Sequence, residues 1–415
     1  MKSNWKKVKL SDICDVRDGT HDSPKRTAEG RFLITSKHIK GGKIDLSSAY
    51  KISLKDFDMV NQRSKVDQWD ILLSMIGTIG EVCIVKEEPD FAIKNVGLIK
   101  TNDEILSLYL YYYLKTPTAQ SDILARLKGT TQQYLSLGEI RSFPISIPQD
   151  DRVMRKITKI LSSIDDKIEL NNKINQNLES QAQAIFKSWF VDFEPFDGKM
   201  PADWKSGTFS ELITNTVGGD WGKDELQDNY TEEVYCIRGA DIPDVKIGNR
   251  GKMPKRYILQ KNYSLKKLND GDLVVEISGG SPTQSTGRIA AISDYLLNRY
   301  KNKIICTNFC KSLKPRKNYS EYVYHYWQYL YDKNIFFGYE NGTTGIKNLD
   351  ISAFLETEPV IIPSQNILVA FAEVCRKTFA QIYHNGYENE TLAQLRDTLL
   401  PKLMSGEIDA SDVAV

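Results

Sequence analysis

The sequence has few of the residues on which most catalytic and metal sites depend. Its 415 residues include only four histidines, and these are dispersed at His21, His38, His325 and His384. None belongs to an HExxH motif or to a cluster with the spacing of metal ligands. The six cysteines form no CxxC pair, and Cys306 and Cys310 have no second pair to complete a site. We therefore expect no metal, and we interpret the cysteines as small buried residues.

Two motifs of nucleotide-dependent enzymes are also missing. No Pro-Pro dipeptide occurs, so the Asp/Asn-Pro-Pro-Tyr/Phe motif of amino-group methyltransferases is absent. No GxxxxGK[ST] phosphate-binding loop is present either. The charged run 165–169, Asp-Asp-Lys-Ile-Glu, looks like a carboxylate cluster, but it lies in a segment expected to be helical and is interpreted as a solvated face. The sequence thus predicts a protein that is not an enzyme.

The chain carries almost no excess charge and no long apolar run. Its net charge is +1, so binding to nucleic acid would require basic groups that are gathered locally. No stretch of 18 uncharged apolar residues predicts a membrane span. The segment 1–7, Met-Lys-Ser-Asn-Trp-Lys-Lys, lacks the apolar core of a signal peptide. A cytoplasmic location is expected.

What the sequence does contain is an internal duplication. Five segments recur in the same order, and the offset between copies drifts only from 199 to 215 residues. The paired segments are 5–13 with 204–213, 33–39 with 236–242, 69–74 with 271–276, 129–131 with 342–344, and 145–148 with 360–363. Two unrelated domains that share a strand-like composition would be the alternative. The ordered matches favour two copies of one domain.

Each copy has the same local plan. An apolar strand is followed by a glycine-containing loop and a second strand, with Gly77-Thr78-Ile79-Gly80 in the first loop. The corresponding loop of the second copy, 278–285, is longer and rich in serine. Each copy also has one aromatic helix-like segment, 105–115 and 321–331. Tyrosines 109 and 111–113 could stack on bases, but packing inside the domain is the favoured interpretation.

A long helix follows each domain. After Asp150 and Asp151, which can cap a helix start, apolar residues recur every seven positions. The two rows are Ile157, Ile164, Leu178 and Ile185, with Asn171 in the gap, and Leu161, Ile168 and Ala182, with Asn175 in the gap. A coiled-coil seam interrupted by one polar layer gives this pattern, and such a layer can determine register. An ordinary amphipathic helix packed on its own domain is the alternative.

A similar helix begins after Ser364. Ala372, Phe379, Ala393 and Leu400 repeat every seven residues, Gly386 lies between them, and Asn389 supplies a polar layer. Two similar seams in one chain suggest that the helices pack on each other. Between the copies, the segment 188–198 carries four aromatic residues, and its Pro195 and Gly198 end the helix. These aromatics are expected to anchor the connection.

This plan resembles the DNA-specificity subunits of type I restriction–modification systems. The most specific phrases are the helix ends 184–195, Ala-Ile-Phe-Lys-Ser-Trp-Phe-Val-Asp-Phe-Glu-Pro, and 395–406, Leu-Arg-Asp-Thr-Leu-Leu-Pro-Lys-Leu-Met-Ser-Gly. The strand–GxxG–strand segment around Gly77 and Gly80 is also similar to a target-recognition domain of that family. The second copy departs from this pattern in its longer loop.

The resemblance implies an α+β fold with two tandem target-recognition domains, each followed by a long helix, the helices pairing as an antiparallel coiled coil. The expected parts are 1–149 and 204–363 for the domains, 150–203 for the central helix and connector, and 364–415 for the C-terminal helix and tail. The implied function is to bind a bipartite, asymmetric DNA site and to direct adenine methylation and restriction by partner subunits.

The implied partners are double-stranded DNA, two modification (methyltransferase) subunits and two restriction (translocase/nuclease) subunits. S-adenosylmethionine, ATP and Mg would bind to those partners, and this chain would bind no cofactor. A coiled-coil scaffold and a stand-alone DNA-binding regulator are the alternatives. Docking surfaces for partners are sought on the exposed helix faces and at the aromatic helix end formed by Trp189, Phe190 and Phe193.

Candidate DNA-binding residues are polar side chains in loop-like segments, several at matched positions of the duplication. Bases are read through side chains such as Arg, Lys, Asn, Gln, Ser and Thr, whereas phosphate contacts only position the protein. The first copy supplies Thr20, His21, Lys25, Ser36, Lys37, His38, Thr78, Thr131 and Gln132, and the second supplies Arg238, Lys252, Ser281, Thr283, Gln284, Thr344 and Lys347. Solvated loop residues without a DNA contact are the alternative for each of them.

Overall fold

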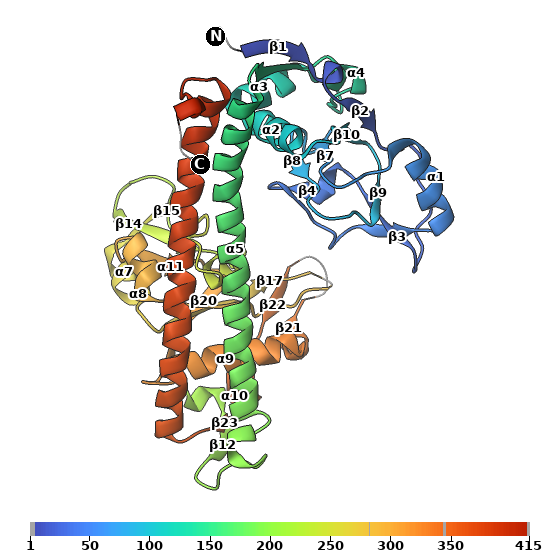
Figure 1. Ribbon diagram of the computed structural model, residues 1–415. Coiled ribbons are helices and arrows are strands. Elements are labelled where there is room, and N and C mark those ends of the chain that lie inside the picture. The colour runs from blue at the N-terminus through green and yellow to red at the C-terminus, as the bar shows by residue number, and fades with distance from the viewer. Residues whose placement is uncertain (1–4, 282, 343–345, 413–415) are drawn as a thin grey trace. The chain divides into compact units, whose positions relative to one another are not determined.

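The computed structural model describes residues 5–281, 283–342 and 346–412. It divides into two compact units, residues 1–166 with 393–415 and residues 167–392. Each unit contains one copy of the duplicated domain together with a part of both long helices (Figure 1). Within the described ranges no helix is sufficiently long and apolar to cross a lipid bilayer.

The first domain is a set of small sheets with short helices. Strands β1 (Trp5–Lys9) and β11 (Pro144–Pro148) pair antiparallel and bring the two ends of the domain together. An antiparallel sheet has the order β2-β10-β7-β8, and a three-stranded sheet has the order β6-β3-β9, in which β3 and β9 are parallel. Their bounds are β2 Asp15–Asp18, β3 Arg31–Ile34, β6 Tyr50–Ile52, β7 Ile71–Ser74, β8 Val82–Ile84, β9 Phe91–Ile93 and β10 Val96–Lys100.

The remaining elements of the first domain lie around these sheets. Helix α2 packs against β8, and α1 packs against β9 (Figure 1). The elements are β4 (Ile39–Lys40), β5 (Lys43–Ile44), α1 (Leu54–Ser64), α2 (Glu104–Lys115), α3 (Pro117–Ala125) and α4 (Leu137–Arg141). Tyr109 and Tyr112 of α2 are buried, and the Tyr109 hydroxyl donates to the Ser146 carbonyl at 2.6 Å. The tyrosines of α2 therefore contribute to packing inside the domain, which was the interpretation favoured from the sequence.

The second domain repeats the topology of the three sheets described for the first. Strand β12 pairs with β23, the antiparallel sheet has the order β13-β20-β16-β18, and the three-stranded sheet has the order β15-β14-β19 with β14 and β19 parallel. Their bounds are β12 Lys205–Thr208, β13 Ile213–Gly218, β14 Tyr230–Ile237, β15 Lys255–Leu259, β16 Leu273–Glu276, β18 Ile289–Ala291, β19 Ile304–Cys306, β20 Cys310–Pro315 and β23 Pro359–Ile362. The predicted duplication is confirmed.

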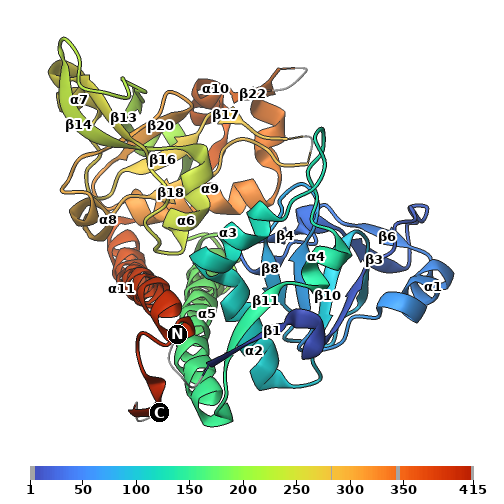
Figure 2. The same cartoon turned by 90° about the horizontal axis from the view of Figure 1, so that it is seen from above.

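The helices of the second domain follow the same scheme. Helix α9 lies against β18, as α2 lies against β8, and the view in Figure 2 shows α9 beside this sheet. A further sheet, β17-β22-β21, has no full counterpart in the first copy. These elements are α6 Ile242–Lys246, α7 Gln260–Lys266, β17 Ser278–Gly279, α8 Asp294–Arg299, α9 Ser320–Asp332, β21 Glu340–Asn341, β22 Lys347–Leu349 and α10 Ile351–Thr357.

The two long helices, α5 (Asp151–Phe190) and α11 (Gln365–Met404), have 40 residues each. In the first unit Met154, Ile157 and Leu161 of α5 share one core with Leu400, Leu403 and Met404 of α11. The Arg396 guanidinium contacts the Asp165 carboxylate there at 2.7 Å. Residue numbers rise along α5 as they fall along α11, so the contacting segments run antiparallel. Coiled-coil packing in the strict sense stays a prediction.

The predicted polar residues Asn171, Asn175 and Asn389 belong to a cluster of buried asparagines in the second unit, which also includes Asn385. The Asn171 amide donates to the Asn389 side-chain oxygen at 2.9 Å, and the Asn385 amide donates to that of Asn175 at 2.8 Å. Each bond joins α5 to α11. That this polar layer sets the register of the two helices stays a prediction.

The aromatic connector is part of the core of the second unit. Phe190 is buried, and its ring centroid lies 4.8 Å from Tyr322 and 5.1 Å from Phe371. Trp204 packs on it at 5.6 Å. The connector is thus anchored, as expected. Phe190 is not available for docking a partner, because its ring is already covered by the core of its own unit.

A close backbone approach explains Gly386 in α11. A Cβ atom on Gly386 would lie 2.0 Å from the carbonyl oxygen of Gly248, which belongs to the loop after α6. Alanine is a better helix former than glycine by about 1 kcal/mol. Steric overlap with the Gly248 backbone should outweigh that gain, because overpacking typically costs about 1–3 kcal/mol.

We expect Gly386→Ala to lower the free energy of unfolding measured by urea denaturation. Gly138→Ala in α4 is the matched control, since its Cβ would meet only the Ser136 hydroxyl at 4.0 Å. That variant should be neutral or more stable. Equal stabilisation by both substitutions would show that α11 and the loop at Gly248 are not in contact.

Candidate nucleic-acid interface

The candidate residues of the first copy gather where several strands end. Strands β2, β3, β7 and β9 are followed by the loops 19–26, 35–38, 75–81 and 94–95. Because β3 and β9 are parallel, their carboxyl ends Ile34 and Ile93 are neighbours. The Lys94 N–H donates to the Ile34 carbonyl at 2.8 Å, which joins two of these loops. Binding residues are disproportionately carried by loops that a rigid scaffold positions.

Asn95 is the residue at which the predicted segments meet. Its N–H donates to the Thr20 carbonyl at 3.1 Å, and its own carbonyl accepts from the Ser36 hydroxyl at 3.1 Å. Its side-chain oxygen lies 2.7 Å from Nδ1 of His21. The Thr78 hydroxyl donates to the Ser36 carbonyl at 3.2 Å. The structure thus brings Thr20, His21, Ser36 and Thr78 together around a residue that sequence reasoning missed.

Two of the predicted residues, Ser36 and His38, are buried within their own domain. Ser36 is buried, and its hydroxyl oxygen accepts from the N–H groups of Met75 at 3.2 Å and Ile76 at 3.4 Å. His38 is fully buried, and its Nδ1 accepts from the Thr35 N–H at 2.9 Å. Burial, followed by the charge of Lys37, lowers the pKa of His38, so the neutral imidazole is the favoured form. In the present conformation neither side chain can reach a ligand.

We expect Ser36→Ala to destabilise the protein by about 1–3 kcal/mol, since the buried N–H of Met75 and the partly buried N–H of Ile76 lose their acceptor. Urea unfolding measures this loss. Ser121→Ala on the exposed surface of α3 is the control, and such a substitution should change the free energy of unfolding by less than about 0.5 kcal/mol. A variant of full stability with an altered DNA preference would instead give the Ser36 hydroxyl a direct role in recognition.

The remaining candidates of the first copy are accessible. Lys25 and Lys37 are exposed, and the described residues offer neither of them an ion-pair partner. Thr131 and Gln132 are exposed in a loop closed by Lys128 and Tyr134, whose backbones exchange two hydrogen bonds of 2.9 Å. The Leu135 N–H donates to the Met75 carbonyl at 2.9 Å, which holds this loop beside the one that carries Thr78. Polar side chains from three loops therefore share one region.

In the second copy, several candidates are bound to their own domain. Arg238 forms an ion pair with buried Asp241 at 2.9 Å, and its guanidinium also donates to the Lys252 carbonyl at 2.7 Å. The ion pair raises the pKa of Arg238. Lys347 contacts Glu340 at 2.8 Å and is only 24% exposed. Lys252 itself is exposed. Arg238 thus holds its loop together in the structure as it stands.

The serine-rich loop is the accessible part of the second copy. Ser281 and Gln284 form a short bridge, in which the Ser281 hydroxyl accepts from the Gln284 N–H at 3.0 Å. The side chains of Thr283 and Gln284 are exposed. The loop is joined to β22, since the Leu349 N–H donates to the Ile277 carbonyl at 2.8 Å. Thr344 lies outside the described residues.

Equivalent hydrogen bonds at the strand ends show which residues of the two copies correspond. The Thr307 N–H donates to the Ile237 carbonyl at 3.0 Å, as Lys94 donates to Ile34. Arg238 therefore corresponds to Thr35, and Asp241 corresponds to His38, at the predicted offset of 203. The residue after Thr307 is Asn308, which is exposed and corresponds to Asn95. This 213-residue offset equals that of the Gly-Thr-Thr repeat, and it was the signal that could have identified both asparagines.

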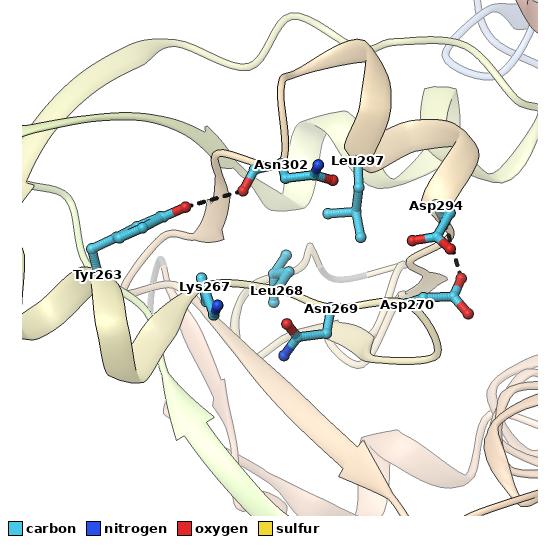
Figure 3. Close-up of a pocket in the computed structure, with 8 residues that line it drawn as sticks. All are labelled: Tyr263, Lys267, Leu268, Asn269, Asp270, Asp294, Leu297 and Asn302. Atoms are coloured by element: carbon cyan, nitrogen blue, oxygen red, sulfur yellow. Dashed lines mark hydrogen bonds between the residues drawn. The ribbon is translucent and has the colours of Figure 1, made fainter.

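A hollow of about 340 Å³ lies elsewhere in the second domain. Figure 3 shows it lined by Tyr263, Lys267, Leu268, Asn269, Asp270, Asp294, Leu297 and Asn302. Asn269 precedes β16 and Asn302 precedes β19, so the hollow lies at the amino ends of these strands. The loops described above follow the carboxyl ends. The hollow is thus separate from the candidate interface.

The described residues contain neither a disulfide bond nor a cluster of metal ligands. All six cysteines are free thiols, and Cys306 and Cys310 are buried. Burial raises the pKa of both thiols to about 12. Among the residues that the structure describes, no group of three or more His, Cys, Asp or Glu is placed to hold a metal ion.

Comparisons with known proteins converge on one family. Residues 2–180 match the model of the type I restriction modification DNA specificity domain. The chain is 28% identical to the type I restriction enzyme MjaIX specificity subunit of Methanocaldococcus jannaschii over 99% of this chain and 95% of that protein. It is 27% identical to the HindI specificity subunit of Haemophilus influenzae over 72% and 77% of the two chains.

A solved structure has the same fold. The crystal structure of the type I restriction–modification S subunit from M. genitalium superimposes with a TM-score of 0.54. The match covers 97% of this chain and 96% of that one at 18% identity. The arrangement of two mixed helix–strand domains, each followed by a long helix, is therefore shared along the whole length.

Proposed function

Because the chain is a relative of the type I restriction enzyme specificity subunits, and its residues 2–180 belong to their DNA specificity domain family, we propose that it recognises a bipartite, asymmetric DNA sequence. As a specificity subunit it is non-catalytic. It directs partner subunits that methylate adenines and restrict DNA. S-adenosylmethionine, ATP and Mg bind to those partners.

The observation that carries this proposal is the repetition of one topology with different side chains at the same strand ends. Both domains place loops after equivalent strands, but the loop after β7 presents Thr78 where the loop after β16 presents Thr283 and Gln284, and Lys37 after β3 stands where the second copy has Ala240 after β14. Similar folds with different polar loops suit two different half-sites, since base edges are discriminated by side-chain chemistry. The division into 1–149, 150–203, 204–363 and 364–415 remains part of the proposal.

The accessible candidates form the proposed DNA-binding set. They are Thr20, His21, Lys25, Lys37, Thr78, Thr131 and Gln132 in the first domain and Lys252, Ser281, Thr283 and Gln284 in the second. Ser36, His38, Arg238 and Lys347 support these loops from within. Lysines supply phosphate contacts, which dominate affinity, while the threonines, serine and glutamines supply base contacts.

Binding of duplex DNA with and without a methyltransferase partner tests the function. We expect sub-micromolar, sequence-dependent binding in the presence of the partner. Tight specific binding by the chain alone would support a stand-alone regulator. Absence of sequence preference in the complex would support a scaffold, and either result would contradict the proposal.

The duplication also bears on stoichiometry. Two equivalent surfaces, each made of a domain and a helix, suit two copies of one modification subunit related by a pseudo-twofold axis. By the same reasoning we propose two restriction subunits. Native mass spectrometry of the co-expressed complex at saturating methyltransferase should give two modification subunits for each chain. One copy, or none, would contradict this arrangement.

A further inference from the structure

An asparagine occupies the same place in both domains. Asn95 follows β9 and Asn308 follows β19, and in each case the preceding residue is hydrogen-bonded to the end of the neighbouring parallel strand, Lys94 to Ile34 and Thr307 to Ile237. Only one additional residue, Phe309, separates Asn308 from the next strand. The two asparagines are therefore equivalent members of the duplicated fold.

Backbone conformation does not account for this coincidence. Asn95 has a φ of +51°, a value that asparagine tolerates better than most residues. Asn308 is absent from the residues with positive φ, so its backbone has no comparable need for asparagine. A shared structural requirement would be expected to act on both positions. The amide group is the property that the two positions have in common.

The neighbours of the two asparagines differ strongly. Beside Asn95 lies His21, whose Nδ1 is 2.7 Å from the amide oxygen and whose Nε2 contacts buried Asp18 at 3.1 Å. The corresponding residue of the second domain is Trp221, which is stacked under Arg256 with the guanidinium 4.3 Å from its ring centroid. Gly19 and Gly219 establish this correspondence, because a Cβ on either would collide with the backbone at the end of β9 or β19.

Both amides are available to a ligand. Asn308 is exposed, and Asn95 is partly exposed. Within the described part of the chain, hydrogen bonds engage the oxygen of the Asn95 amide but leave its NH₂ group unused. That oxygen has a second lone pair, so it can still accept another hydrogen bond. An amide that presents a donor beside an acceptor matches the N6 and N7 groups of adenine in the major groove.

We propose that Asn95 and Asn308 are equivalent specificity residues, each reading one adenine in the half-site bound by its own domain. This inference rests on the proposed function and assigns a base contact within it. The surrounding loops, which differ between the copies, read the bases that distinguish one half-site from the other. The shared asparagine reads a base that both half-sites have in common.

Methylation mapping of the complete complex tests the two residues separately. Asn95→Gly removes the amide and keeps a backbone that tolerates positive φ, whereas Asn308→Ala suffices where φ is ordinary. Each variant should relax the preference for one A·T pair by about 5- to 150-fold, the range for one bidentate contact. The change should be confined to one half-site for Asn95→Gly and to the other for Asn308→Ala.

Matched controls separate recognition from folding. Asn102→Gly changes another exposed asparagine of positive φ, at 55°, that precedes α2 and lies away from the strand ends, and Asn298→Ala changes an exposed asparagine of α8. Both should leave the target unchanged. All four variants are compared by urea unfolding, so that a loss of stability is not mistaken for a loss of preference.

Three outcomes overturn the inference. If a variant binds all DNA sequences more weakly but keeps the same target sequence, the amides contact phosphates and not bases. If neither the affinity nor the target sequence changes, the amides have no role in recognition. A change in both half-sites caused by either variant would show that the positions are not independent. A wild-type complex that methylates no bipartite site would overturn the proposed function itself, which is distinguishable because it does not depend on the variants.

Discussion

Inserting seven helical residues at two matched positions is expected to lengthen the unread spacer of the DNA target without changing either half-site. The positions are between Asp166 and Lys167 in α5 and between Leu392 and Ala393 in α11, where the two compact units divide. Insertion there preserves the Arg396–Asp165 contact of one unit and the Asn171–Asn389 contact of the other. Seven residues also return a helix nearly to the same face.

The size of the effect follows from helix geometry. Seven residues add about 10 Å at 1.5 Å per residue. B-DNA rises about 3.4 Å per base pair, so the spacer should grow by about three base pairs if the added length runs along the DNA. Mapping methylated adenines in cells that carry the complex measures the spacer. A helical insertion that leaves the spacer unchanged would contradict a spacing role for the helices.

A flexible insertion is the control for this experiment. Seven glycine and serine residues at the same two positions add chain but no rigid length. The complex should then accept several spacers, or lose methylation, in place of selecting one longer spacer. The contrast between helical and flexible insertions distinguishes rigid spacing from simple separation.

The largest effect of pH on stability is expected from His325. This residue of α9 is fully buried, its Nδ1 lies 3.0 Å from the Gln183 side-chain oxygen, and its ring stacks on Phe379 with centroids 6.0 Å apart. Burial, followed by the charge of Lys246, lowers the pKa of His325 to about 3. The folded protein therefore keeps the imidazole neutral at pH values where the unfolded chain would protonate it.

The sign of the effect follows from this lowered pKa. Above about pH 6.5 the histidine is neutral in both states and the stability is fully present. As the pH falls from 6.5 towards 3, the unfolded state gains a proton and the folded state does not, so stability is lost. At about 1.4 kcal/mol per pKa unit, the loss at pH 4 is about 3 kcal/mol.

The variant His325→Phe should reduce this acid sensitivity. The aromatic contacts with Phe186, Phe371 and Phe379 can be retained, while the titrating group is removed. Urea unfolding at pH 7.5 and pH 4 should give a smaller difference for the variant than for the wild type. His384→Gln, at an exposed position of α11, is the control and should behave as the wild type. Equal acid sensitivity of wild type and His325→Phe would exclude a dominant role for this residue.

The features that could be predicted from sequence are those set by local periodicity. The heptads interrupted at Asn171 and Asn175 predicted a polar layer in a long helix, and both residues are buried in contact with α11. The offset of 203 correctly aligned Thr35 with Arg238, because each residue directly follows the strand that pairs in parallel with its neighbour, β3 with β9 and β14 with β19. The aromatic segments 105–115 and 321–331 became α2 and α9.

The roles of individual loop residues could not be obtained in this way. Ser36 looks like an exposed loop serine in sequence, but it is buried by Met75 and Ile76, which are distant in the chain. Arg238 stays a predicted DNA contact, but its ion pair with Asp241 and its hydrogen bond to the Lys252 carbonyl could not be foreseen from sequence. Such pairings depend on tertiary contacts that periodicity does not encode. Asn95 could have been found as a counterpart of Asn308 from the 213-residue offset, but the three loops that converge on it are visible only in the structure.

The central claim is that two independent target-recognition domains each determine one half of a split DNA site. Exchange of residues 1–149 for the corresponding domain of a relative, followed by genome-wide mapping of methylated adenines in the complete complex, tests it most directly. The wild type should give one bipartite, asymmetric target, and the exchange should replace one half-site while the other half-site and the spacer persist. Replacement of both half-sites, or methylation at a single continuous sequence, would contradict the account.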